Sequence, residues 1–119
     1  ALDTWQNPVR KDPIRHISLA LNGLGFVALR EKHYEEAKQF FMDAIQSAEE
    51  FGRVDELAKG QVGLASVSFE TGTDLKNSLL LINGSIESFQ QLGMQYEIQK
   101  SLELRGKVLK AQPKILISD

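Results

Sequence analysis

Residues 21–28 (LNGLGFVA) and residues 37–44 (AKQFFMDA) decide the fold, because each stretch sets small side chains among large apolar ones at helical spacing. Gly25 lies in the first stretch, and Ala37 and Ala44 lie in the second. Two antiparallel helices approach closely only where small side chains meet, and larger side chains fill the space beside these contacts. The two stretches therefore predict a pair of closely packed helices.

The same arrangement returns further along the chain. Small residues mostly align with small residues, and large residues align with large ones. The corresponding pairs are Phe41 with Ile82, Ala44 with Ser85 and Gly52 with Gly93 at a shift of 41 residues, and Gly25 with Gly63 at a shift of 38. A helix pair that cannot cover its own apolar face must stack on a neighbouring pair, so the pattern predicts a helical solenoid.

Turn signals divide the chain into five expected helices. Asp12 followed by Pro13 is typical of a helix start, Gly52 and Gly93 are typical of helix ends, and Asp74 is expected to cap the fourth helix. We expect an all-α fold with an extended arm over 1–12, a repeat domain over 13–110 and a C-terminal tail over 111–119. The expected helices span residues 13–30, 34–51, 55–70, 74–92 and 95–110.

The first of these helices carries apolar residues at helical spacing along one face. We expect this face to enter the core. Its members are Ile14, Ile17, Leu21, Leu24 and Ala28, with Phe26 and Leu29 beside them.

Composition excludes several classes of protein. The chain has 119 residues, of which 42% are hydrophobic and 25% are charged, so it is long enough for one globular domain. It contains no cysteine, which excludes disulfides and thiolate chemistry, and its net charge of −2 does not favour nucleic acid as a partner. Residues 17–29 are too few to span a membrane, and no apolar leader precedes them, so we expect a cytoplasmic protein that does not bind membranes.

Catalytic and cofactor motifs are not recognisable in the sequence. His16 and His33 are the only histidines, and neither has a nucleophile or a metal-ligand set around it. Residues 23–28 match the dinucleotide pattern G-x-G-x-x-A, but that pattern requires a strand before it, and here it lies inside a predicted helix. We therefore expect no enzyme activity, no cofactor and no metal.

The repeats resemble the tetratricopeptide repeat family, in a variant with long repeats. The family pattern joins a leucine-glycine helix to an A-x3-F helix. The matching residues are Leu21-x2-Leu24-Gly25-x2-Ala28 with Ala37-x3-Phe41, then Lys59-x2-Val62-Gly63-x2-Ser66 with Ser78-x3-Ile82, and then Leu102-x2-Arg105-Gly106-x2-Leu109 as a half repeat. The aromatic residues of the family's first helix are missing, and Glu49 stands where the family has proline. The resemblance implies a right-handed solenoid with a concave groove.

The resemblance also implies which residues line that groove and what they bind. A partner protein or peptide would lie there as a helix or an extended segment, with acidic residues near the basic fifth helix. The implied groove residues are Asn22, Phe26 and Leu29 of the first helix, Gln61, Leu64 and Ser68 of the third, and Lys100, Glu103 and Lys107 of the fifth. Two alternatives stay open: a structural or self-associating segment of a longer solenoid, and a regulatory sensor for a small peptide.

Overall fold

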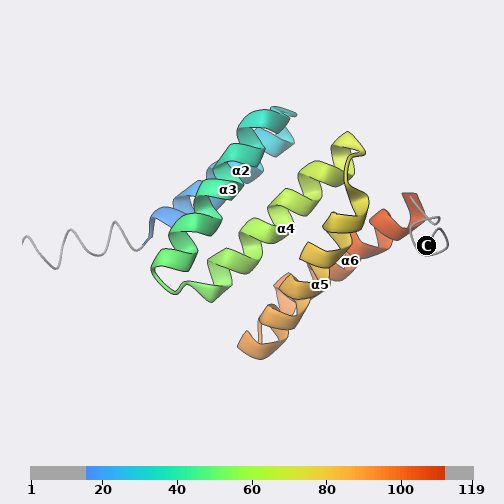
Figure 1. The fold of residues 1–119 in the computed structure, drawn as a ribbon. Coiled ribbons are helices and arrows are strands. Elements are labelled where there is room, and N and C mark those ends of the chain that lie inside the picture. Colours follow the sequence, from blue (N-terminus) through green and yellow to red (C-terminus); the bar gives the residue numbers. More distant parts are fainter. Residues whose placement is uncertain (1–15, 112–119) are drawn as a thin grey trace, which may run out of the picture.

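Five α-helices run antiparallel in chain order through the computed structural model, which describes residues 16–111 (Figure 1). They are α2 (Ile17–Arg30), α3 (Tyr34–Glu50), α4 (Val54–Thr71), α5 (Leu75–Leu92) and α6 (Gln95–Ala111). The all-α prediction is confirmed, and each helix end from Arg30 to Ala111 falls within one residue of its expected position. The expected arm over 1–12, the helix start at Pro13 and the tail beyond Ala111 lie outside the described residues.

The turns after α3 and α5 have the same form, which the turns at Lys32 (φ of 65°) and Gly72 (φ of 71°) after α2 and α4 share. Gly52 follows α3 with φ of 68°, and Gly93 follows α5 with φ of 71°, a region that side chains with a Cβ atom disfavour. The next amide donates a hydrogen bond back to the Ala48 carbonyl (2.8 Å) in the first turn and to the Phe89 carbonyl (2.9 Å) in the second. Asp74 precedes α5 as expected, but its side chain makes no capping hydrogen bond.

The core consists of two clusters of buried side chains that share α4. The first cluster joins α2, α3 and α4, and the second joins α4, α5 and α6. The first contains Ala28, Leu29, Ala37, Phe41 and Val67, and the second contains Ala65, Leu75, Ile82, Ile86 and Val108. Since α4 supplies side chains to both, it is the central helix of the fold.

Glycines in α2 and α4 let the ring of Phe41 lie between these helices. A Cβ atom built on Gly25 would lie 2.6 Å from Phe41 Cε1, and one built on Gly63 would also overlap the ring. Phe41 itself has no exposed surface. Small residues thus mark the close approaches, as the sequence pattern predicts.

The buried face of α2 differs from the expected one. Ile17 and Leu24, which were expected in the core, are 42% and 49% exposed. Ser18, Asn22 and Gly25 are buried in their place. The expectation was right for Ala28 and Leu29, which are buried. It was wrong for Ile17 and Leu24, because close packing against α3 and α4 selects the face with the smallest side chains.

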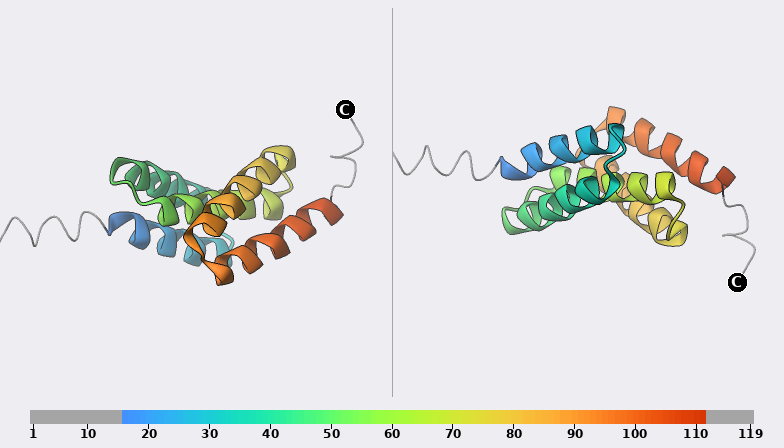
Figure 2. Two further views of the ribbon diagram at one scale, coloured as in Figure 1. Left: turned by 90° about the horizontal axis from the view of Figure 1, so that it is seen from below. Right: turned by 90° about the horizontal axis from the view of Figure 1, so that it is seen from above.

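The helices also contact one another beyond chain neighbours. Figure 2 shows α2 and α6 on one side of α4, with α3 and α5 on the other, and α4 contacts both α2 and α6. In α6 the buried residues are Ser101 and Val108, whereas Gly106 faces open space. The predicted half repeat around Gly106 is therefore wrong in register: Ser101, which lies 38 residues after Gly63, is the small buried residue of this helix.

Candidate functional site

A groove with a volume of about 940 Å³ lies between α2 and α6, and α4 forms its floor. All three helices contribute apolar side chains that keep some exposed surface. These side chains are Leu19 and Phe26 of α2, Val62 and Phe69 of α4, and Leu104 of α6. Apolar surface left open over three helices is typical of a binding site.

Two aromatic rings, Phe26 and Tyr96, lie on opposite sides of the groove. The Phe26 ring meets the buried Phe41 ring edge to face, with 4.8 Å between centroids and 69° between planes. This contact joins the α2 wall to the core. On α6, Tyr96 is 69% exposed at the rim, and the Lys100 Nζ lies 5.7 Å from its ring centroid. A partner entering the groove would meet a rigid ring on one side and an exposed ring on the other.

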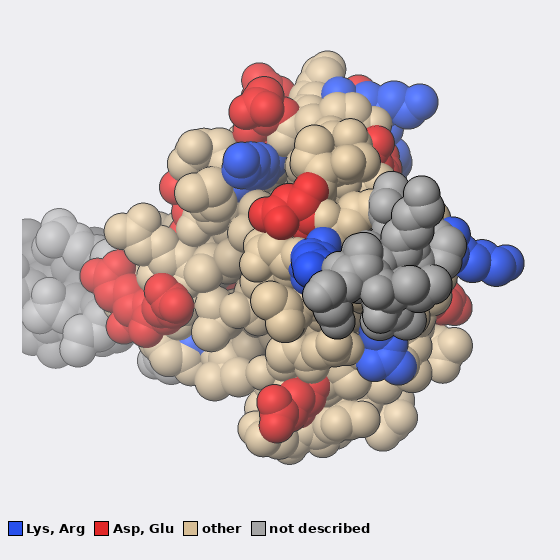
Figure 3. Space-filling model, turned by 45° about the vertical axis from the view of Figure 1, so that its right-hand side comes forward, with Lys and Arg blue, Asp and Glu red and all other residues tan. Residues whose placement is uncertain are grey.

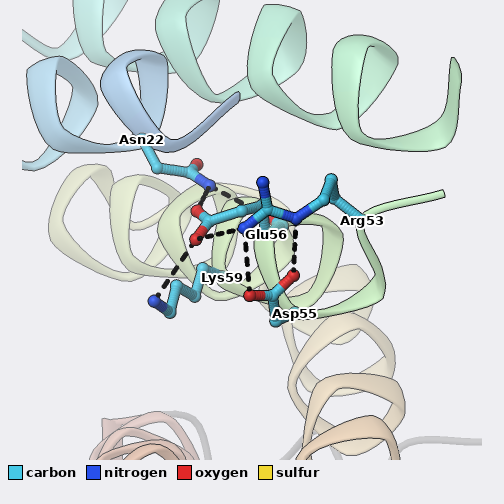
Figure 4. Close-up of polar contacts among 5 residues, drawn as sticks. All are labelled: Asn22, Arg53, Asp55, Glu56 and Lys59. Atoms are coloured by element: carbon cyan, nitrogen blue, oxygen red, sulfur yellow. Dashed lines mark hydrogen bonds and ion pairs between the residues drawn. The ribbon is translucent and has the colours of Figure 1, made fainter. Parts of the chain in front are cut away.

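A buried carboxylate joins α2 to α4 in the groove wall (Figure 4). Glu56 is 1% exposed, and the Asn22 Nδ2 donates to its carbonyl oxygen at 2.9 Å and to its Oε1 at 3.0 Å. The Lys59 Nζ lies 3.4 Å from the other carboxylate oxygen, Oε2, and the Arg53 Nη2 lies 4.0 Å from it. Because the carboxylate is paired and hydrogen-bonded, its burial does not leave an isolated charge.

Arg53 also binds the neighbouring carboxylate of Asp55 through two contacts of 3.4 Å, from Nε and from Nη2 (Figure 4). Burial alone raises the pKa of Asp55. The hydrogen bonds from Arg53 and from the Glu56 backbone N–H, together with the charges of Arg53 and Lys59, outweigh burial and lower the pKa below its usual value. The charged side chains at the start of α4 are therefore held in place by contacts with one another, next to the groove.

Three buried polar atoms have no hydrogen-bond partner within residues 16–111: Ser18 Oγ, Asn22 Oδ1 and Ser101 Oγ. The Asn22 amide turns its NH2 group to Glu56 because both acceptors there are oxygens, and this leaves its own oxygen near Gly60. Asn22 and Ser101 both line the groove. Unpartnered buried groups lower stability, so each of these atoms should reduce the free energy of unfolding.

Charges of both signs surround the groove. The basic side chains are Arg30, Lys59, Lys100 and Lys107, and the acidic ones are Glu56, Glu70, Glu97 and Glu103. Glu70 accepts a hydrogen bond from the Tyr34 hydroxyl at 3.2 Å. On the face drawn in Figure 3, Lys and Arg side chains are likewise interspersed with Asp and Glu. The basic end that the sequence implied for the fifth helix is thus broken by Glu97 and Glu103.

The structure brings together six of the nine implied groove residues. Asn22, Phe26 and Leu29 line the groove from α2, and Lys100, Glu103 and Lys107 line it from α6. Whether they bind a partner stays a prediction.

The three implied residues of α4 do not line the groove. Gln61 lies near the Ser85 hydroxyl of α5, and Leu64 packs on the core cluster around Phe41. Ser68 likewise lies outside the groove, which Lys59, Val62 and Ser66 line instead. The register differs by two residues because α4 packs on helices all around, so its apolar period does not mark one face.

Sequence reasoning missed Glu56 and Lys59, the central residues of the polar cluster. One signal was available. Asn22 is the only amide in the stretch 17–29, which is apolar apart from Asn22 and Ser18, and a buried amide requires a polar partner. Glu56 lies one turn before Gly60, where α4 comes close to Asn22 of α2 and to Ile45 of α3.

The histidines lie away from the groove lining. His33 is exposed in the turn before α3, with Nδ1 3.7 Å from Glu31 and 3.4 Å from Glu36. Within the described ranges, no group of three or more acidic or histidine side chains is placed to hold a metal ion. Among the five helices described, none has both the length and the hydropathy needed to cross a membrane.

Comparisons of the chain with models of known protein families, with curated proteins and with solved structures give no match.

Proposed function

We propose that the chain is a protein-interaction module and that the groove between α2 and α6 binds a helix or an extended segment of a partner protein. The observation that carries this proposal is the groove itself, whose apolar side chains come from three helices and stay partly exposed. Small-molecule pockets rarely exceed about 1,000 Å³ and are mostly closed. The groove's volume of about 940 Å³ lies within this range, but the groove is open along one side, and this open side suits a segment of polypeptide better than a small molecule that must be enclosed.

The same proposal includes the finer architecture. A right-handed solenoid of the tetratricopeptide type would place the first helix of each pair, here α2, α4 and α6, along the concave side. Three observations support it. Helix α2 contacts α4 as well as α3, and Phe41 of α3 packs against Gly25 of α2 and Gly63 of α4. In addition, Gly25, Gly63 and Ser101 follow one another at intervals of 38 residues.

The partner segment should carry apolar side chains together with acidic ones. Lys100 and Lys107 line the groove two turns apart, and neither has a carboxylate within ion-pair distance in the described part of the chain. Acidic groups on a bound helix would therefore pair with these two lysines, next to Glu97 and Glu103 of the same helix. The apolar groups of the same helix would cover Leu19, Phe26 and Leu104.

Selection of binding peptides from a displayed library of helical sequences tests the proposal. The affinity of the enriched peptides is then measured by fluorescence anisotropy. Leu19→Glu should weaken binding by about tenfold or more, because it puts a charge on the apolar wall. Leu80→Glu is the matched control, since Leu80 is an exposed leucine on α5 outside the groove lining.

Charge reversal tests the expected polarity of the partner. Lys100→Glu combined with Lys107→Glu should weaken the enriched peptides, and Lys38→Glu, on the exposed surface of α3, should not. Equal affinity of all variants would refute acidic recognition along α6. Failure of Leu19→Glu to affect any enriched peptide would refute the groove as the binding site.

A further inference from the structure

Helix α2 is apolar on every side. Residues 17–29 contain no charged side chain, and a helix of that kind is normally covered all round. One face of α2 packs in the core through Ser18, Gly25 and Ala28, and a second face lines the groove through Leu19 and Phe26. Neither contact covers the third face.

The third face is a stripe of exposed apolar side chains, which we call the outer stripe. Its members are Ile17 (42% exposed), Ala20 (exposed), Leu24 (49%) and Val27 (46%). These positions follow each other at i, i+3, i+7 and i+10, so they lie on one side of the helix. Within the described residues no helix packs over them.

The other end of the helix array has a different surface. The exposed positions of α6 outside the groove lining include one large apolar residue, Leu102, and are otherwise polar or small: Gln95, Gln99, Gly106, Lys110 and Ala111. Helical arrays need polar outer surfaces at their ends to stay in solution. Among the described helices, α6 thus exposes one large apolar side chain outside the groove, whereas α2 exposes three in the outer stripe.

The outer stripe is complementary to itself. In an antiparallel pair of α2 helices with a two-fold axis beside residue 22, Ala20 of one copy faces Leu24 of the other, and Ile17 faces Val27. The small side chain of Ala20 then meets the larger one of Leu24, and the β-branched side chains of Ile17 and Val27 meet each other. The outer stripe has no charged side chain that would repel the same stripe on a second copy. Two-fold interfaces require this reciprocal pairing of residues.

We propose that a second copy of this chain covers the outer stripe, giving a two-fold dimer through α2 that leaves the groove free. The groove face and the outer stripe are separate sides of α2, so this proposal does not depend on the proposed function. The area is small, and association should therefore depend on protein concentration.

Sedimentation equilibrium over a wide range of concentration tests the dimer. We expect the mass to rise from that of one chain to that of two. Leu24→Glu should raise the protein concentration at which half of the chains are dimeric by at least about tenfold, since it places two charges in an apolar contact. Leu80→Glu changes a leucine that is even more exposed, at 71%, and should leave this concentration unchanged. Circular dichroism checks that each variant stays folded.

A paired substitution tests the antiparallel geometry. Ile17→Lys alone and Val27→Glu alone should each weaken the dimer, whereas I17K combined with V27E should restore it, because position 17 of one copy faces position 27 of the other. Restoration supports the proposed axis, and a double variant weaker than both single variants refutes it.

Two outcomes would overturn the proposal altogether. One is a dimer that Leu24→Glu does not weaken. The other is a chain that stays monomeric at every concentration. If, in that monomer, the emission of Trp5, the only tryptophan, shifts to the red on Leu24→Glu, residues 1–15 cover the stripe in place of a second copy.

Discussion

Replacing Gly63 with alanine would put a methyl group into the space that the ring of Phe41 fills. A Cβ atom built on Gly63 overlaps the ring at Cε1, Cδ1 and Cζ. The ring cannot withdraw toward α2, because the backbone at Gly25 closes that side at a similar distance. Phe41 has no exposed surface through which to leave. Helix α3 or α4 must therefore shift to admit the methyl group.

The expected magnitude is the sum of two opposing effects. Gly→Ala inside a helix stabilises by about 1 kcal/mol through backbone entropy and helix propensity. Adding a methyl group to a fully packed core costs about 1–3 kcal/mol. The Phe41 ring is confined between Gly25 and Gly63 and cannot move away, so we expect a cost near the upper end. We expect Gly63→Ala to lower the free energy of unfolding by about 1–2 kcal/mol.

Gly23→Ala is the matched control. Gly23 lies in α2, and a Cβ atom there would meet no atom within 4 Å, so the propensity gain should appear alone, at up to about 1 kcal/mol. Urea unfolding followed by far-UV circular dichroism measures both variants. In a thermal scan, each kcal/mol should move Tm by roughly 4–8 °C in a domain of this size, in opposite directions for the two glycines.

A double-mutant cycle with Phe41→Leu separates overpacking from other causes. In the smaller Phe41→Leu core, Gly63→Ala should lose its cost and show the propensity gain. If Gly63→Ala stabilises the native chain as much as Gly23→Ala does, the ring does not fill the space beside α4, and the packing described here is wrong.

Three further predictions concern the polar cluster and the turns. Glu56→Ala should lower the free energy of unfolding by about 1–3 kcal/mol in urea titrations, because it removes the acceptor that Asn22 uses in the buried wall; an unchanged unfolding curve would contradict this. Asp55→Asn should lower Tm at neutral pH. The folded pKa of Asp55 lies below 3.8, so its ionised form stabilises the fold above that pH, and the difference from the native chain should vanish as pH falls through the folded pKa; a Tm difference constant with pH would count against the contact with Arg53. Gly93→Ala should cost about 1–2 kcal/mol, since φ of 71° strains a residue with a Cβ atom; a stabilised variant would exclude that backbone geometry.

Helix number and helix ends could be predicted because local chemistry decides them. Gly52 and Gly93 stop their helices through backbone geometry that needs no information from the rest of the fold. Small residues such as Ala37 and Gly25 marked the close approaches because steric fit depends on side-chain size alone.

Which side of each helix is buried could not be predicted as well as where the helices begin and end. Periodicity identifies one buried face only when the other faces are polar. Helix α2 is apolar all round and α4 is packed all round, so the pattern left their rotation open. This is why Leu24 was expected in the core and Leu64 in the groove. The cluster around Glu56 required knowing that Asn22 and the start of α4 meet, and this follows only from the rotation of both helices.

The sharing of α4 between two core clusters has a consequence for the order in which the chain opens. Neither of the two core clusters is complete without side chains from α4, so we expect global unfolding to occur in one transition. Helix α6 is the exception, because it buries only Ser101 and Val108 and can detach while the other helices stay in place. Its amides should exchange with solvent hydrogen first. A ligand seated against both α2 and α6 should slow that exchange without altering the protection of α3.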